Sequence, residues 1–278
     1  MRSSFSVHLF VVPASVLFQF ARVLLLLIAG LGSALADAQA EVTLKPLRVA
    51  YLEFPPISYQ TADGTPAGSF IELTRKVALE AGYQPDFIYL PVSRVYLYLT
   101  NGAIDVWPGV TEVPSLEGEV LESWVSPFPV QLSAWYREGT PPLEHFDQLQ
   151  GKRVIVINGY TYGGLKGWLE RNGGIRITEA PNHRSAVDML KRSRGDYLLD
   201  YRAPVQEILK EPSSSVIRES EVRTRNTAWV FSLANPRAAL LRNEFDDAYL
   251  RLVEKGELPP VREISSGYVI PGFPEDVR

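Results

Sequence analysis

Short apolar runs alternate along the chain with segments whose apolar residues recur at helical spacing. The run 47–51 alternates and is rich in β-forming residues, so it predicts a first strand. Further strands are predicted at 87–90 and 104–107. Between the strands, the spacing predicts helices from Phe70 to Ala81 and over 94–100. Strands and helices that alternate over short connections favour a parallel sheet with helices on its faces.

The same alternation begins again after residue 146. Residues 153–157 are almost continuously apolar, which is typical of a strand buried on both faces. Further elements are predicted as a helix at 165–171, a strand at 175–177, a helix capped by Asn182, a strand at 197–199, a strand at 228–231, and a final helix that carries Leu241, Phe245, Ala248 and Leu252. The chain therefore contains two α/β units and a closing segment.

Two stretches between these units, 132–145 and 212–227, are rich in proline, serine and charge and are interpreted as linkers. Two linkers mean that the chain crosses from the first unit to the second and returns. We therefore predict an α/β fold of two lobes, each a mostly parallel sheet with flanking helices, joined by two hinge crossovers. The predicted boundaries are 44–132 for the first part of lobe 1, 138–222 for lobe 2 and 227–278 for the return to lobe 1.

The first strand leads into the unusual sequence Phe54-Pro55-Pro56. Prolines cannot donate ladder hydrogen bonds, so this pair should stop the strand and stiffen its exit. We expect the exit to present Tyr51 and Phe54 at the floor of a ligand cleft and not in the core.

The N-terminal segment resembles an export signal. An apolar core over 23–31 follows Arg22, and Ala34-Leu35-Ala36 is a small-x-small cleavage site. We predict a cleaved signal peptide over 1–36; the alternative is a membrane anchor. The mature protein is expected outside the cytoplasm, in the periplasm of a Gram-negative source.

Charge and motifs exclude several function classes. The first 36 residues contain two arginines and no acid, so the remainder carries 26 basic and 32 acidic residues, a net charge of −6. This surface does not favour nucleic acid as a partner. The 278 residues contain no cysteine, no HExxH, no GxSxG and no Walker loop. We therefore predict no enzymatic activity, no catalytic residues, no metal and no cofactor.

No functional role is predicted for the histidines or for the paired acids. His145 and His183 match no metal-ligand spacing, and a surface or capping role is expected for both. The pairs Glu117/Glu119 and Asp246/Asp247 are expected on solvated faces.

A series of short motifs in fixed order resembles one known family over about residues 47–258. These motifs are Phe54-Pro55-Pro56, Gly68 to Leu73, Leu99 to Asp105, Gly109-Val110-Thr111, Val125 to Pro129, Asp147 to Lys152, Gly195 to Asp200, and Leu252 to Gly256. In this order they resemble the bacterial extracellular solute-binding proteins of family 3, the receptors of ABC importers of polar amino acids and their relatives. The resemblance implies a monomer whose lobes close on a small solute and transiently meet an inner-membrane ABC permease.

The resemblance also implies where the ligand binds. In that fold the site lies at the carboxyl ends of the strands. The corresponding candidate ligand-binding residues here are Tyr51, Phe54, Gly109, Thr111, Asn158, Tyr160, Thr161, Tyr162, Asp200 and Tyr201. Arg94, at a predicted helix N-terminus, is a further candidate for an anionic group. Trp107 and Tyr59 are expected to serve packing, whereas Tyr160 and Tyr162 beside glycines favour ligand contact.

The sequence departs from the family at the amino-acid clamp. Where amino-acid binders carry the arginine that holds the ligand α-carboxylate, this chain has Leu116. Leucine cannot form the bidentate fork. The acid that receives the α-ammonium aligns with Asp200 or Tyr201. An ordinary free α-amino acid is therefore not the expected ligand; a small polar or anionic solute is.

Two alternatives stay open from the sequence. One is a lyase- or dehydratase-like enzyme on the same scaffold, with Glu53, Glu72 and Asp200 as acid/base candidates. The other is a ligand-sensing module.

Overall fold

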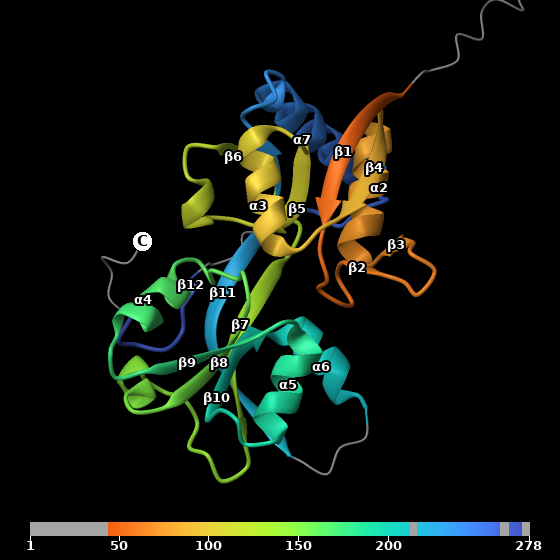
Figure 1. The fold of residues 1–278 in the computed structure, drawn as a ribbon. Helices are drawn as coiled ribbons and strands as arrows, with labels where there is room; N and C mark the ends of the chain where they lie inside the picture. The colour runs from red at the N-terminus through yellow and green to blue at the C-terminus, as the bar shows by residue number, and fades with distance from the viewer. Residues whose placement is uncertain (1–43, 212–215, 262–266, 274–278) are drawn as a thin grey trace, which may run out of the picture. The chain divides into compact units, whose positions relative to one another are not determined.

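The computed structural model describes residues 44–211, 216–261 and 267–273, which form a mixed α/β fold around a ten-stranded sheet (Figure 1). The predicted signal peptide, residues 1–36, lies outside these residues. Among the described residues, no helix is long and apolar enough to cross a membrane.

Three parallel strands form one end of the sheet. β1 (Lys45–Tyr51) pairs with β4 (Tyr83–Tyr89) along its whole length and with β5 (Val106–Val110) at Val49↔Val106. Neighbouring residues of β1 face opposite sides of the sheet, as in any strand. Val49 lies in one apolar core and Ala50 in the other, so both faces of β1 are covered.

Helices cover both faces of these strands. α2 (Ser69–Glu80) and α7 (Ala238–Glu254) contact each other and share the core of Val49. α3 (Val92–Asn101) contributes Val95 and Leu99 to the core on the other side. The predicted helices are therefore present, with α3 beginning slightly earlier than the spacing indicated.

Both predicted linkers contain strands that pair with each other. β7 (Pro129–Arg137) covers residues 132–137 of the first stretch, and β11 (Ile217–Ser232) covers residues 217–227 of the second. The two strands pair antiparallel from Asn226↔Pro129 to Ile217↔Arg137. Figure 1 shows them running side by side between the two groups of parallel strands. The local sequence did not indicate these strands, because their pairing depends on a partner that lies far away in the sequence.

The second group of strands continues the sheet beyond β7. Its members are β8 (Arg153–Ile157), β9 (Arg176–Ala180) and β10 (Tyr197–Tyr201). In the sequence, α4 (Leu165–Arg171) and α5 (His183–Lys191) lie between these strands, and α6 (Arg202–Leu209) follows β10. β10 is antiparallel to β7, whereas β8 is parallel to both of its neighbours. The bounds predicted for β8 and α4 are confirmed, and Asn182 caps α5 through a hydrogen bond from the Ser185 N–H.

Short elements complete the fold. They are β2 (Tyr59–Gln60), β3 (Pro66–Ala67), the 3₁₀ turns η1 (Pro114–Leu116) and η2 (Phe146–Leu149), β6 (Val120–Glu122) and β12 (Gly267–Tyr268). The full strand order is β4-β1-β5-β11-β7-β10-β8-β9, with β6 and β12 both paired to β11.

The C-terminal residues 267–273 depart from the predicted return to lobe 1. β12 pairs with β11 at Arg223 and Thr224, and the rings of Tyr268 and Phe273 lie 5.8 and 5.5 Å from that of Phe146. This segment therefore packs on residues that were assigned to lobe 2, because the Phe146 ring offers it an apolar contact.

One acidic pair also differs from its expected setting. Asp246 is buried, and its carboxylate accepts hydrogen bonds from the backbone N–H groups of Trp124 and Val125, both at 3.1 Å. The solvated interpretation was wrong for Asp246, because two backbone donors replace its water. It holds for Asp247, Glu117 and Glu119, which are exposed.

Candidate ligand-binding site

A cavity lies where the two groups of parallel strands end. Its walls come from residues at or just after the carboxyl ends of β1, β5, β8 and β10, together with residues of β7, β11, α2 and α3. They surround about 570 Å³ of space, part of it open to solvent.

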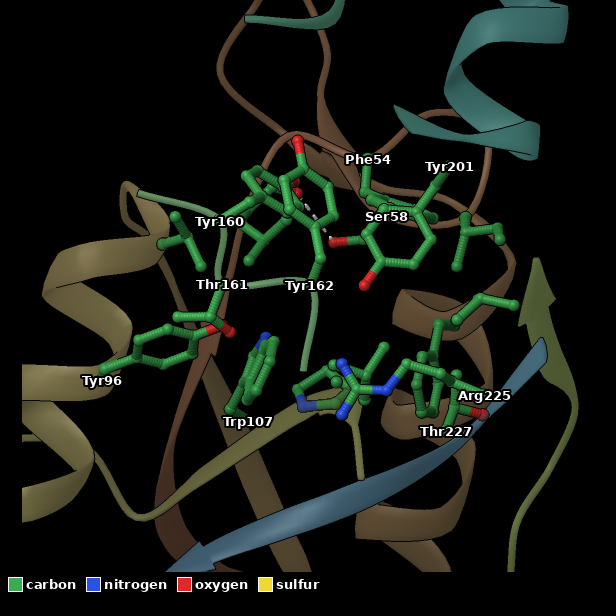
Figure 2. A pocket seen from close by; sticks show the side chains of 18 residues that line it. Phe54, Ser58, Tyr96, Trp107, Tyr160, Thr161, Tyr162, Tyr201, Arg225 and Thr227 are labelled. Atoms are coloured by element: carbon green, nitrogen blue, oxygen red, sulfur yellow. Dashed lines mark hydrogen bonds between the residues drawn. The ribbon is translucent and has the colours of Figure 1, made fainter. Parts of the chain in front are cut away.

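The walls are mostly apolar, and seven of the eighteen residues that form them are aromatic. Figure 2 shows the aromatic side chains around the space and Arg225 pointing toward it from the side of β11. The aromatic members are Phe54, Phe70, Tyr96, Trp107, Tyr160, Tyr162 and Tyr201, and the polar side chains are Ser58, Thr161, Arg225 and Thr227.

The structure brings together part of the predicted ligand set. Six of the predicted residues line the cavity: Phe54, Gly109, Tyr160, Thr161, Tyr162 and Tyr201. The contact between Phe54 and Tyr201, at 5.2 Å between ring centroids, closes the space between the two groups of strands.

The other five predicted residues do not line this cavity. Tyr51 is 1% exposed and packs edge-on against Phe87 and Tyr89, so it belongs to the core and not to the cleft floor. Arg94 and Asn158 are exposed on their elements. Thr111 contributes its carbonyl oxygen as an acceptor for Arg225, and Asp200 is engaged with His183.

Trp107 lines the cavity, contrary to the expectation that it serves packing alone. Its indole lies over Gly109, where an added Cβ would sit 2.3 Å from a ring carbon. Gly109 therefore makes room for the tryptophan wall. This close approach is a tertiary feature that the sequence motif did not reveal.

Tyr160 and Tyr162 form a second wall. Their rings are stacked with centroids 5.7 Å apart, and the Tyr162 hydroxyl accepts a hydrogen bond from the Ile157 N–H at 2.7 Å. Burial is the largest cause that raises the pKa of both hydroxyls well above the usual range. Both side chains are therefore neutral phenols at physiological pH and present apolar faces with one polar tip each.

Arg225 is the charged residue of the cavity that sequence reasoning missed. It lies in the stretch 212–227 that was interpreted as a linker. A β-bulge between Glu221 and Arg223 shifts the register of β11 against β7, and after it Arg223, Arg225 and Thr227 share one face of the strand. The alternation Arg223-Thr224-Arg225-Asn226 was the available strand signal.

The guanidinium of Arg225 is almost fully buried, with the residue 1% exposed. Its Nη2 donates to the carbonyl oxygens of Thr111 and, at 2.9 Å, Glu112. Its Nε is buried without a hydrogen-bond partner in the described structure. Gly163 lies close by, since a Cβ there would meet Arg225 Cζ at 3.1 Å. The absent side chain at Gly163 thus leaves room for the cation.

His183 is also placed differently from its expected surface or capping role. It is 4% exposed, and its Nδ1 lies 2.8 Å from an Asp200 carboxylate oxygen. Its Nε2 faces the carbonyl oxygen of Glu53 at 3.2 Å and the hydroxyl of Tyr160 at 3.4 Å. The Asp200 carboxylate also accepts from the Tyr201 N–H at 2.8 Å. The pair thus connects β10 and α5 to the segment that follows β1. His145, by contrast, caps η2 as expected.

The protonation of His183 should make stability depend on pH. Burial lowers the pKa of His183, but the charge and hydrogen bond of Asp200 outweigh it and raise the pKa above 6.5. A raised folded-state pKa stabilises the protein fully below the unfolded value and progressively less as pH rises through the folded value. We expect the melting-temperature advantage of wild type over His183→Gln to be largest below about pH 6.5 and to shrink as the pH rises above that value.

Thermal denaturation of both proteins across this pH range measures the effect. A difference between them that grows as pH rises would contradict the charged His183–Asp200 pair.

An amino-acid clamp of the kind that the resemblance implies would need an arginine at position 116 and a free acid on the cavity wall. Leu116 is buried in the apolar core. Among the described residues that line the cavity, none is aspartate or glutamate. Glu53, Glu72 and Asp200, the acid/base candidates, are not on its wall. Within the described residues there is also no cluster of three or more His, Cys, Asp or Glu arranged for a metal.

The chain belongs to the bacterial extracellular solute-binding proteins, family 3, whose sequence profile matches residues 47–263. This confirms the resemblance found in its motifs. No curated protein matches the sequence.

Solved structures confirm the two-lobed, type II periplasmic-binding-protein fold. A histidine kinase sensor domain with similarity to periplasmic binding proteins matches with a TM-score of 0.67 at 20% identity over 77% of this chain and 93% of its own. An ancestral arginine-binding protein bound to arginine matches at 0.64 and 20%, over 77% and 95%. A Streptococcus pneumoniae ABC uptake transporter substrate-binding protein with bound histidine matches at 0.62 and 17%, over 76% and 88%.

Proposed function

We propose that the protein is a periplasmic solute receptor that captures a small polar or anionic solute between its lobes and delivers it to an ABC-type permease. The observation that carries the proposal is the cavity itself, whose walls come from the ends of both groups of parallel strands. Closure of the lobes on a solute would bury it between Phe54 and Trp107 on one side and Tyr160 to Tyr162 and Tyr201 on the other.

The proposal keeps the lobe boundaries 44–132, 138–222 and 227–261, and places residues 267–273 with lobe 2. It includes a cleaved signal peptide over 1–36, a monomer in transit and transient contact with a permease. Family membership supports an extracellular site of action. The neighbours with bound arginine or histidine support ligand capture as the common use of this fold.

An ordinary free α-amino acid is not the proposed solute. Leu116 replaces the clamp arginine, and the acid near the second-lobe position is paired with His183. An α-ammonium group in the cavity would therefore meet no free carboxylate from the described lining.

A ligand-sensing module is the second candidate, favoured by the match to a histidine kinase sensor domain. Both candidates share the capture step and differ in the partner. The enzyme alternative receives less support, because Glu53, Glu72 and Asp200 do not line the cavity. We therefore propose a binding protein without catalytic activity.

Thermal-shift screening against a library of amino acids, organic acids, sugars and amines tests the proposal. A ligand at about 100 times its Kd stabilises its receptor by about 2.7 kcal/mol. We expect at least one small solute to raise the melting temperature of wild type and to have a much smaller effect on Trp107→Ala. A protein that no member of the library stabilises would argue against a solute receptor. Ligand turnover by the purified protein would favour the enzyme instead.

A further inference from the structure

We infer that the solute is a carboxylate with a flat apolar body and no amino group, and that its carboxylate docks on Arg225. This inference rests on the proposed function and names the ligand class for the same cavity. The residue that would bind the anion lies on β11, the strand that passes between the lobes, and not at position 116, where leucine replaces the expected arginine.

The first step is the unbalanced charge of Arg225. In the described part of the chain, no carboxylate oxygen forms an ion pair with its guanidinium within 4.0 Å. Two backbone carbonyls occupy Nη2, whereas Nε is buried and has no partner. A buried charge without a counter-charge is costly, so a bound anion would recover much of the desolvation free energy.

No acid of the described residues lies within the ion-pair distance of 4.0 Å from the Arg225 guanidinium. Burial raises the pKa of Glu122 on β6, and the charge of Arg225 has the smaller, opposite effect. The Glu122 carboxylate accepts from the Glu112 N–H at 2.7 Å. Arg223, two residues earlier on the same face of β11, does have an acidic partner. Its Nη2 lies 3.4 Å from a Glu112 carboxylate oxygen, and its guanidinium lies over the Tyr268 ring. Arg225 is therefore the cation that remains available to a ligand.

The second step is the exclusion of an amino group. No aspartate or glutamate is among the described residues of the cavity wall. Two carboxylates adjoin this wall in the sequence. Asp200 accepts from His183 and from the Tyr201 N–H. Glu53 lies between the wall residues Leu52 and Phe54, but Glu53 itself is not among the wall residues. A ligand ammonium would be desolvated without a partner and repelled by Arg225. The site should therefore discriminate against amines and zwitterions.

The third step concerns the ligand body. Trp107 and Tyr96 lie on one side, with ring centroids 5.7 Å apart, and the stacked Tyr160 and Tyr162 lie on the other. Burial, the largest cause, raises the pKa of Tyr96 above its usual range, so this hydroxyl also stays neutral. Neutral aromatic faces favour a flat apolar group over a sugar or a polyanion, because stacking buries apolar area without leaving many hydroxyls unpaired.

Four compounds with one phenylpropyl skeleton test the inference by titration calorimetry. They are 3-phenylpropanoate, 3-phenylpropan-1-ol, 3-phenylpropylamine and phenylalanine. We expect 3-phenylpropanoate to bind at least about tenfold more tightly than the alcohol, because a charge-assisted hydrogen bond exceeds a neutral one. The amine and phenylalanine should bind more weakly than the alcohol, because each brings an ammonium group.

Variants of two arginines on β11 test whether Arg225 contacts the ligand carboxylate. Arg225→Met should weaken 3-phenylpropanoate binding about 10- to 100-fold while leaving the alcohol nearly unchanged. Arg225→Lys, which keeps the charge, should recover part of the loss. Arg223→Met is the matched control, since this arginine lies on the same strand face but outside the cavity wall, and it should leave binding unchanged. A purely structural role for Arg225 would weaken the acid and the alcohol equally, which overturns the inference.

Two further outcomes separate this inference from the proposed function. If library screening finds a ligand without a carboxylate, or one that binds Arg225→Met as well as wild type, the inference is wrong and the receptor function stands. If neither the four compounds nor any library member binds wild type, the proposed function itself fails. Should Arg225→Met not fold, the Arg225→Lys variant and the comparison of acid with alcohol on wild type still decide the ligand class.

Discussion

Replacing Asp200 with alanine is expected to lower the free energy of unfolding by roughly 3–5 kcal/mol at about pH 6. Asp200 is fully buried, and its carboxylate accepts from His183 at 2.8 Å and from the Tyr201 N–H at 2.8 Å. At this pH His183 carries a proton, because its pKa is raised. Removing the carboxylate leaves the buried His183 cation without its counter-charge and leaves the His183 Nδ1–H and the Tyr201 N–H without acceptors. Chemical denaturation of wild type and variant measures the loss.

Two variants control for this prediction. Asp200→Asn keeps an acceptor of the same shape, so its loss should be intermediate. Glu211→Ala breaks an exposed ion pair with Arg184 of α5, the residue next to His183, at 2.8 Å, and should cost no more than about 1 kcal/mol. An Asp200→Ala protein within about 1 kcal/mol of wild type at this pH would show that the pair contributes little to stability.

Replacing Phe146 with alanine should destabilise the protein by about 3–5 kcal/mol and release the C-terminal segment 267–273. Phe146 is fully buried, and its ring contacts those of Trp168, Tyr268 and Phe273 at centroid distances of 5.5, 5.8 and 5.5 Å. The cavity left by the ring would remove the apolar contact that holds this segment. Chemical denaturation measures the global loss, and hydrogen exchange of the Val269 amide, which donates to the Val222 carbonyl at 2.9 Å, reports the local release.

Phe245→Ala is the matched control for the second prediction. Phe245 is equally buried, but it lies on α7 and packs against Tyr83 of β4 and against Trp229 and Phe231 of β11. Both variants should lose global stability, and only Phe146→Ala should accelerate local exchange at Val269 beyond that loss. Equal acceleration in the two variants would mean that the segment does not depend on Phe146.

Local periodicity was sufficient to predict an element where that element carries its own apolar pattern. The strand at Arg153–Ile157 and the helix at Leu165–Arg171 have the bounds that their residues predict, and Asn182 caps α5 as its side chain allows. These features depend on residues within a few positions of each other, so a single sequence reveals them.

Local periodicity did not predict the polar part of β11. Residues 217–227 carry alternating charges and no apolar stripe, yet they form β11 because β7 supplies hydrogen-bond partners along the whole stretch. The partner strand is far away in the sequence, and the bulge between Glu221 and Arg223 decides which face Arg225 occupies. No local pattern contains that information.

The residues of the candidate site also fall into those that local sequence predicted and those that it did not. The motifs predicted which strand ends meet, and Phe54, Gly109, Tyr160 to Tyr162 and Tyr201 line the cavity there. Whether a side chain turns toward the cavity or the core depends on its packing neighbours, so Tyr51, Arg94 and Trp107 were placed wrongly. The buried pair of His183 and Asp200 joins two elements 17 residues apart and follows from their packing alone.

The sequence by itself thus determined the family, the two α/β units and a leucine at position 116, where the resemblance places the clamp arginine, since each rests on residue identity and short-range spacing. Only the tertiary structure decided that Arg225 is the cation of the cavity, that His183 is buried against Asp200, and that residues 267–273 pack on Phe146. The physical reason is that strand pairing, register and burial are properties of contacts between distant segments, and these contacts set the charge balance of the site.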